Sequence, residues 1–194
     1  AQFATFEEAG GEGANRWFRV SLFEGRNLGP ERPAINVREP PSFMDGTEEK
    51  QPWTHVPVTE GEWAGWMKYG DDPFEDLTGP FYYRTEDDGT VRCAFRAERK
   101  HMNGGMFMHG GCLMTFADYA LFCIARKDLQ GTGSVTASMN GEFIEGAGIG
   151  DLIEATGEVV RAGGSLVFIR GQITCEGRIL FNFSAIVKKV KRRP

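Results

Sequence analysis

The longest apolar run in the chain covers residues 106–125, "MFMHGGCLMTFADYALFCIA", and it carries a single charge, Asp118. A helix with apolar residues on all sides must be covered on most of them. The Gly-Gly pair after His109 marks the expected start of this helix, and its apolar pattern continues to about Lys127. The pattern therefore predicts a long, central, largely buried helix that holds one carboxylate.

The last third of the chain has the pattern of strands. Four segments, "GSVTASMNGEFIE", "DLIEATGEVVRA", "SLVFIRGQITCE" and "RILFNFSAIVKKV", are separated by the turn signals "GAGIG", "GG" and "EG". Apolar and polar residues alternate within them, which is typical of half-buried antiparallel strands. Upstream, two strand-like runs flank Asp88-Gly89, a strong hairpin signal.

A further helix is predicted to begin near Thr59. The sequence "TEGE" fits a capping box, with Thr59 at the N-cap and Glu62 three residues later. Gly70 can close this helix. Three apolar residues would then share one of its faces: Trp63, Trp66 and Met67.

Residues 1–58 hold most of the prolines and show weak periodicity, although "RWFRVSLF" has the pattern of a short strand. We interpret this region as an extended arm and residues 59–194 as one domain. The order of helix, hairpin, long helix and four strands predicts the α+β class. One curved antiparallel sheet would cover most of the long helix, and a second subunit would cover the rest.

Charge and composition exclude several classes of function. The net charge of −5 gives no reason to expect nucleic acid as a partner. The basic tail "KKVKRRP" is interpreted as a solvated terminus, with a weak anchor for a phosphate-bearing ligand as the alternative. No signal peptide is visible, and no stretch reaches the ~20 apolar residues needed to span a bilayer, so we expect no membrane partner.

The cysteines and histidines lack the spacing of metal or redox motifs. No pair of cysteines is spaced CxxC, and the three histidines show no ligand pattern, so no metal is expected. Cys112 and Cys123 fall inside the apolar run, where they are interpreted as small core residues. Free cysteines are typical of a reducing compartment, which favours the cytoplasm.

Asp118 and the glycine pair are the candidates for chemistry. His109 and Asp118 are nine residues apart, or about 900° around a helix, so they point to opposite sides. Asp118 is either tied by hydrogen bonds to a turn or another subunit, or lines a dry pocket as a general base or nucleophile. The glycines are either a plain N-cap loop or an oxyanion hole built from free N–H groups.

The combination is more specific than its parts. The sequence "NGGMFMHGG", followed by Asp nine residues after the His, resembles the signature of hotdog-fold acyl-CoA thioesterases of the phenylacetate-pathway (PaaI-like) type. The resemblance covers residues 72–190 and includes the strand that opens with Val135-Thr136. It implies a hotdog fold, a long helix wrapped by a curved sheet, and hydrolysis of a thioester.

The resemblance also implies roles for individual residues. Asp118 would be the catalytic carboxylate, and the N–H of Gly110 would polarise the thioester carbonyl. Asn103 and His109 would position the thioester or leaving thiolate, and Thr136 would orient the water. The site would combine Asp118 of one subunit with His-Gly-Gly of another, in a homodimer or homotetramer. The predicted substrate contacts are Gly111, Met108, Thr115 and Arg161.

Two functions follow as hypotheses. The first is hydrolysis of an acyl-CoA or related thioester, with no cofactor because CoA is part of the substrate. The second is a non-catalytic protein that binds acyl-CoA or another acyl ligand. It is favoured by "RAGGS", which lacks the basic residue that family members often carry in this turn, although Arg161 lies nearby. A hotdog-type hydratase is disfavoured because no close Asp and His pair follows the long helix.

Overall fold

The computed structural model describes the backbone of residues 4–10 and 17–22 and the complete residues 54–190. The chain divides into two units, residues 1–50 and 51–194. In the first unit, β1 (Ala4–Gly10) and β2 (Trp17–Leu22) form an antiparallel pair. Strand β2 confirms the strand predicted from "RWFRVSLF", whereas residues 1–3, 11–16 and 23–53 of the predicted arm lie outside the described residues.

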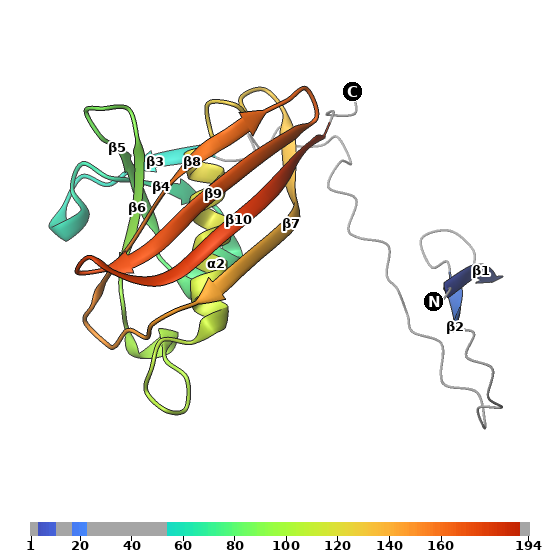
Figure 1. Cartoon of the computed structure of the whole chain (residues 1–194), viewed down its shortest axis with the longest axis horizontal. Coiled ribbons are helices and arrows are strands. Elements are labelled where there is room, and N and C mark those ends of the chain that lie inside the picture. The colour runs from blue at the N-terminus through green and yellow to red at the C-terminus, as the bar shows by residue number, and fades with distance from the viewer. Residues whose placement is uncertain (1–3, 11–16, 23–53, 191–194) are drawn as a thin grey trace. The chain divides into compact units, whose positions relative to one another are not determined.

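The second unit is an eight-stranded antiparallel sheet that curves around one long helix (Figure 1). The spatial order of its strands is β3-β4-β5-β6-β8-β9-β10-β7. The strands are β3 (Thr54–Pro57), β4 (Met67–Gly70), β5 (Tyr82–Thr85), β6 (Val91–Arg96), β7 (Gly133–Phe143), β8 (Leu152–Ala162), β9 (Leu166–Cys175) and β10 (Arg178–Val190). The helices are η1 (Gly61–Trp63), α1 (Pro73–Thr78), η2 (Arg99–His101) and α2 (Gly110–Ile124), where η1 and η2 are single 3₁₀ turns.

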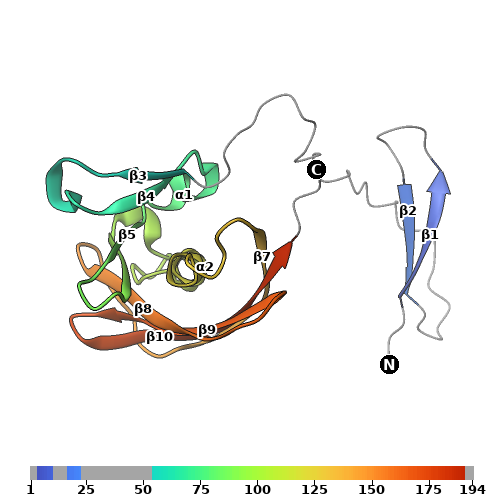
Figure 2. The same ribbon diagram turned by 90° about the horizontal axis from the view of Figure 1, so that it is seen from above.

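Helix α2 lies inside the curve of the sheet, as seen along the helix axis in Figure 2. Its side chains Phe116 and Leu121 are fully buried. Alternate residues of β8 and β9, such as Ile153 and Ile169, belong to the same hydrophobic core. Each such side chain contributes roughly 1.5–3 kcal/mol by its burial. The predicted long helix, the Asp88-Gly89 hairpin and all four C-terminal strands are confirmed, and together they form the hotdog fold.

The helix predicted from Thr59 to Gly70 is wrong. Gly61 and Gly65 have φ values of 75° and 87°, which lie in the left-handed region and interrupt a right-handed helix. Only the short turn η1 forms, and the chain then extends into β4, which pairs with β3. Trp63 packs instead on the ring of Tyr82, with the ring centroids 4.5 Å apart.

Helix α1 is short and was not predicted. Asp72 caps its N-terminus by accepting hydrogen bonds from the N–H groups of Phe74 and Glu75, at 3.1 and 3.0 Å. Pro73 occupies the first helical position, where its missing N–H costs nothing. This local cap fixes the direction of the helix and thereby places Glu75.

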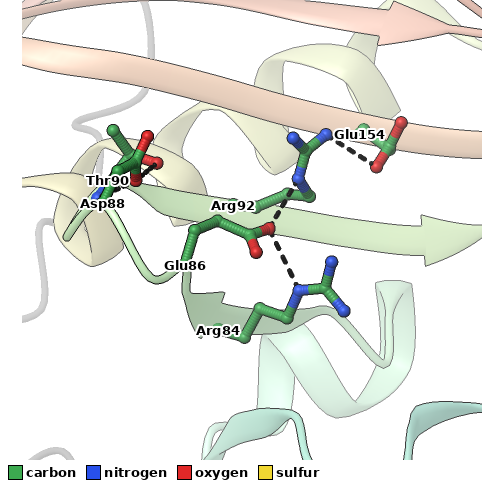
Figure 3. A network of polar contacts seen from close by, with 6 residues as sticks. All are labelled: Arg84, Glu86, Asp88, Thr90, Arg92 and Glu154. Carbon is green, nitrogen blue, oxygen red and sulfur yellow. Dashed lines mark hydrogen bonds and ion pairs between the residues drawn. The ribbon is translucent and has the colours of Figure 1, made fainter.

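A polar network joins the outer faces of β5, β6 and β8 (Figure 3). Glu86 accepts from Nε of Arg84 at 3.0 Å and from Nε of Arg92 at 2.8 Å, and Arg92 also reaches Glu154 at 3.0 Å. Exposed ion pairs contribute about 0.2–1 kcal/mol each. The network therefore adds little to the stability of the three strands, whose pairing is made by their backbone ladders.

Candidate active site

A cavity of about 560 Å³ lies beside α2, between α1, β3, β4 and the start of β7. On the α2 side, the cavity is lined by residues three or four positions apart, which share one face of the helix: Thr115, Asp118 and Phe122. Arg126, just beyond the end of the helix, lines the cavity as well. The other elements contribute both aromatic and polar side chains, including His55, Tyr69, Asp72, Phe74 and Glu75. The cavity is lined by apolar and polar side chains together, and polar groups that converge on one concave surface are a feature of small-molecule sites.

Asp118 is half-buried on the wall of this cavity, so the carboxylate does not face the core. Its Oδ1 accepts a hydrogen bond from the hydroxyl of Thr136 on β7, at 2.7 Å. Burial raises the pKa of Asp118 above its ordinary value, while the Thr136 hydrogen bond lowers it. The structure therefore brings together two predicted site residues that are far apart in the sequence.

The start of α2 offers one free backbone donor. His109 is the N-cap, and its Nδ1 accepts the N–H of Gly111 at 2.9 Å. The N–H of Gly110 meets no acceptor among the described residues. Gly110 therefore presents a donor at the positive end of the helix dipole, whereas the donor of Gly111 is already used.

The predicted loop residue Asn103 organises the segment before α2. Its Oδ1 accepts the N–H groups of Gly105 and Phe107, at 2.8 and 3.2 Å. This turn holds Met106 at a φ of 66°. The side-chain amide of Asn103 keeps its N–H donors for another partner.

His101, which the sequence did not single out as a site residue, supports the same loop from inside. It is 4% exposed, it forms a capping box with Glu98, and its Nε2 lies 2.8 Å from the carbonyl oxygen of Thr78. Its own carbonyl accepts the N–H of His109 at 2.8 Å. His101 thus joins the end of α1 to the residue that caps α2.

Gly110 and Asp118 lie at well-separated positions of the same helix. Gly110 and Asp118 are eight residues apart on α2, which corresponds to about 12 Å along the helix and about 80° around it. Asp118 faces the cavity, and the N–H of Gly110 points out of the helix start. One chain therefore cannot bring both groups to a single carbonyl.

The remaining predicted contacts have different surroundings. Thr115 lines the cavity, although its hydroxyl also donates to the carbonyl of Gly111. Met108 is 5% exposed and belongs to the core, so its predicted contact with substrate would require it to leave that packing. Arg161 is exposed on β8 and does not line the cavity. Roles for these residues in substrate binding stay predictions.

Sequence reasoning missed Glu75. This carboxyl lines the cavity from α1, and burial, followed by the nearby Asp72, Asp118 and Asp76, raises its pKa to about 8. The Asp72-Pro73 pair is a helix-start signal that could have revealed α1. No local signal could have shown that Glu75 faces Asp118, because that depends on how α1 packs.

Known proteins with similar sequences and folds identify the class. The model of the thioesterase superfamily matches residues 105–181. The Pseudomonas aeruginosa protein PA0474, a provisionally named esterase, is 30% identical over 115 residues, which cover 59% of this chain and 86% of that protein. Human acyl-coenzyme A thioesterase 13 is 30% identical over 105 residues, covering 52% of this chain and 72% of the relative.

A solved structure shows the same fold. The PaaI protein from the phenylacetic acid degradation operon of Escherichia coli has a TM-score of 0.55 and 20% identity, covering 62% of this chain and 86% of that one. The fold and the sequence matches together define a hotdog-fold thioesterase. The chain belongs to the thioesterase superfamily, which confirms the resemblance stated from its sequence. Among the described residues, no helix is long and apolar enough to cross a membrane.

Proposed function

We propose that this protein hydrolyses acyl-CoA thioesters to a free acid and a thiol. The observation that carries the proposal is the Asp118 carboxylate, held by Thr136 on the wall of a cavity large enough for an acyl group. The name of the human relative, acyl-coenzyme A thioesterase 13, supports CoA as the thiol. No cofactor is needed because the nucleophile is water.

Asp118 acts as the general base in this proposal. Thr136 donates its only proton to Asp118, which leaves the lone pairs of its hydroxyl oxygen to accept a hydrogen bond from a water molecule. Water held between the two groups can pass a proton to the free oxygen of Asp118 as it attacks the thioester carbonyl. General bases positioned in this way accelerate reactions by about 10²–10⁴-fold.

The N–H of Gly110 stabilises the negative charge that develops on the carbonyl oxygen. A backbone donor at a helix start is already oriented, so it loses little energy to reorganisation when the charge appears. Removing one such donor typically lowers kcat by about 10²–10³-fold. His109 and Asn103 hold the loop that carries Gly110, and their free N–H groups face the thioester or the leaving thiolate.

A second copy of the chain completes the site in this proposal. Strand β7 forms the edge of the sheet, and among the described strands it pairs with β10 on one side only. Its Val135 and Phe143 are 50% and 56% exposed. An edge strand of this length that exposes apolar side chains is suited to pair with another strand. Pairing there would bring the Asp118 of one copy toward the Gly110 of the other.

The test is a panel of acyl-CoA thioesters with detection of the released thiol. We expect the wild-type protein to release CoA from at least one acyl class, and Asp118→Asn to lower kcat by about 10³-fold while the circular dichroism spectrum is unchanged. Asp128→Asn, beyond the end of α2, is the matched control and should behave as wild type. Tight binding of an acyl-CoA without thiol release would instead support the acyl-ligand-binding alternative.

A further inference from the structure

Glu75 is a carboxyl group in the cavity for which the mechanism above has no use. It projects from α1 into the same space that Asp118 lines from α2. Its side chain has no hydrogen bond or ion pair among the described residues, whereas Thr136 holds Asp118. A partly buried carboxyl without a partner is costly, so its presence calls for a physical explanation.

The surroundings of Glu75 favour its protonated form. The groups that face it are mainly acidic or weakly polar, and Arg126 is the one cation that the described residues contribute to the cavity lining. Burial and the nearby acids raise the pKa of Glu75 to about 8, far above that of an ordinary glutamate. The titratable and charged neighbours are His55 on β3, Tyr69 on β4, Asp72 and Asp76 on α1, Cys93 on β6, Asp118, Tyr119 and Cys123 on α2, and Arg126.

We infer that Glu75 is a second acid–base group of this site, the acid that protonates the sulfur of the departing thiol. The inference rests on the proposed thioester hydrolysis. It follows from two carboxyl groups that face one cavity, one of them held by a hydroxyl and the other without a hydrogen bond or ion pair in the part of the chain that the structure describes. Where the environments of two carboxyl groups differ in this way, one serves as base and the other as acid.

The protons balance over one turnover. Water attacks the carbonyl carbon and gives one proton to the Asp118 carboxylate. The carbon–sulfur bond then breaks, and the thiolate takes the proton of Glu75, so the products are the carboxylic acid and the thiol. Asp118 is now protonated and Glu75 is ionised. The proton passes from Asp118 to Glu75 within the cavity, because Glu75 binds it more tightly, and the starting state returns.

The acidity of Glu75 suits this step. An alkyl thiol has a pKa of about 8.5, close to the value of about 8 for Glu75, so the proton moves between groups of similar acidity. An ordinary glutamate would be ionised at neutral pH and would have no proton to give. Activity should accordingly fall as the pH rises through about 8, where Glu75 loses its proton.

The experiment compares Glu75→Gln with wild type on two thioesters of one acyl group. One carries CoA, and the other carries p-nitrothiophenol, a strongly acidic thiol that leaves without needing a proton. We expect Glu75→Gln to lower kcat by roughly 10²-fold on the CoA thioester and by less than about threefold on the nitrothiophenyl ester. Its pH profile should also lose the decline above pH 8. Glu60→Gln, an exposed acid that does not line the cavity, should match wild type on both substrates.

Two results would overturn the inference while leaving the proposed function intact. One is an equal loss on both thioesters, which would mean that Glu75 only supports the cavity, and the other is no loss on the CoA thioester. Asp118→Asn distinguishes the two proposals, because loss of the base lowers kcat on both substrates. A wild-type protein that releases thiol from neither substrate would overturn both the inference and the proposed function.

Discussion

Asp118 can accept a proton only while it is ionised, and its surroundings act on that state in opposite directions. Burial in the cavity wall raises the pKa of the carboxyl, and the hydrogen bond from Thr136 lowers it. A hydrogen bond to a charged group contributes about 1.5–3 kcal/mol. Thr136 therefore favours the ionised form of the proposed base, in addition to holding the water.

Thr136→Val tests this balance with little change of shape, since valine also suits a strand. The hydroxyl stabilises the carboxylate, so its loss raises the pKa of Asp118. Because the base must be ionised, the acidic limb of the kcat/KM profile should move to higher pH. Thr136→Ser keeps the hydroxyl and should leave the limb in place. An acidic limb that does not move in Thr136→Val would show that this hydrogen bond does not control Asp118.

Part of the candidate site could be predicted from the residues alone. Asp118 stands out because a charge interrupts an apolar run. Its spacing of nine residues from His109 shows that the two side chains point to opposite sides of a helix. Thr136 came only from the resemblance, since its contact with Asp118 depends on where β7 passes α2. Glu75 could not be predicted, because only the fold places α1 beside the cavity that Asp118 lines from α2.

The end of α2 packs closely on the sheet at a point where two glycines of neighbouring strands lie opposite each other. Gly157 on β8 lies opposite Gly171 on β9, and the end of α2 passes over this point. A Cβ added at Gly157 would lie 2.4 Å from the carbonyl oxygen of Arg170 and 2.9 Å from Cδ1 of Ile124. Neither the strand nor the helix can move away without disturbing the core.

Gly157→Ala should therefore lower the free energy of unfolding by about 1–3 kcal/mol, the usual range for overpacking a core. Urea unfolding followed by circular dichroism measures the change. Gly164→Ala, in the turn between the same strands, is the control, because a Cβ there meets nothing within 4 Å and should change stability by less than about 0.5 kcal/mol. Equal stability of Gly157→Ala and wild type would contradict the close contact described here.

The elements differ in how well their sequences predicted them. The four C-terminal strands alternate apolar and polar residues because one face of each packs on the core. The alternation along the sequence was therefore enough to predict them as strands. The segment 59–70 has the spacing of a helix, but Gly61 and Gly65 take left-handed backbone conformations and β3 offers a pairing partner. Tertiary pairing thus overrides a local capping signal.

At the scale of the whole molecule, the proposed reaction needs two chains. The α+β arrangement follows from the sequence, because an apolar helix and four alternating strands have few ways to bury their faces. The proposed division of the site between chains rests on helix geometry. Asp118 and Gly110 lie about 12 Å apart along α2, so each needs a partner from elsewhere. In the proposed dimer, the exposed apolar residues of β7 would provide the surface for that pairing.

Gly110 can lose its N–H without losing the helix. It is the first residue of α2, the position at which proline is most readily accepted, and His109 before it already has the extended backbone that precedes proline. The added ring would contact Phe143, whose half-exposed side chain has room to turn away. Gly110→Pro therefore removes the proposed oxyanion donor alone.

The most direct test of the two-chain site is to mix Asp118→Asn with Gly110→Pro after each has proved inactive alone. In a mixed dimer, one site holds both defects and the other holds an intact Asp118 and an intact Gly110. Random exchange makes half of the dimers mixed, each with one working site, so thiol release should recover to about a quarter of the wild-type rate. A mixture that forms mixed dimers yet stays as inactive as its parents would contradict the account.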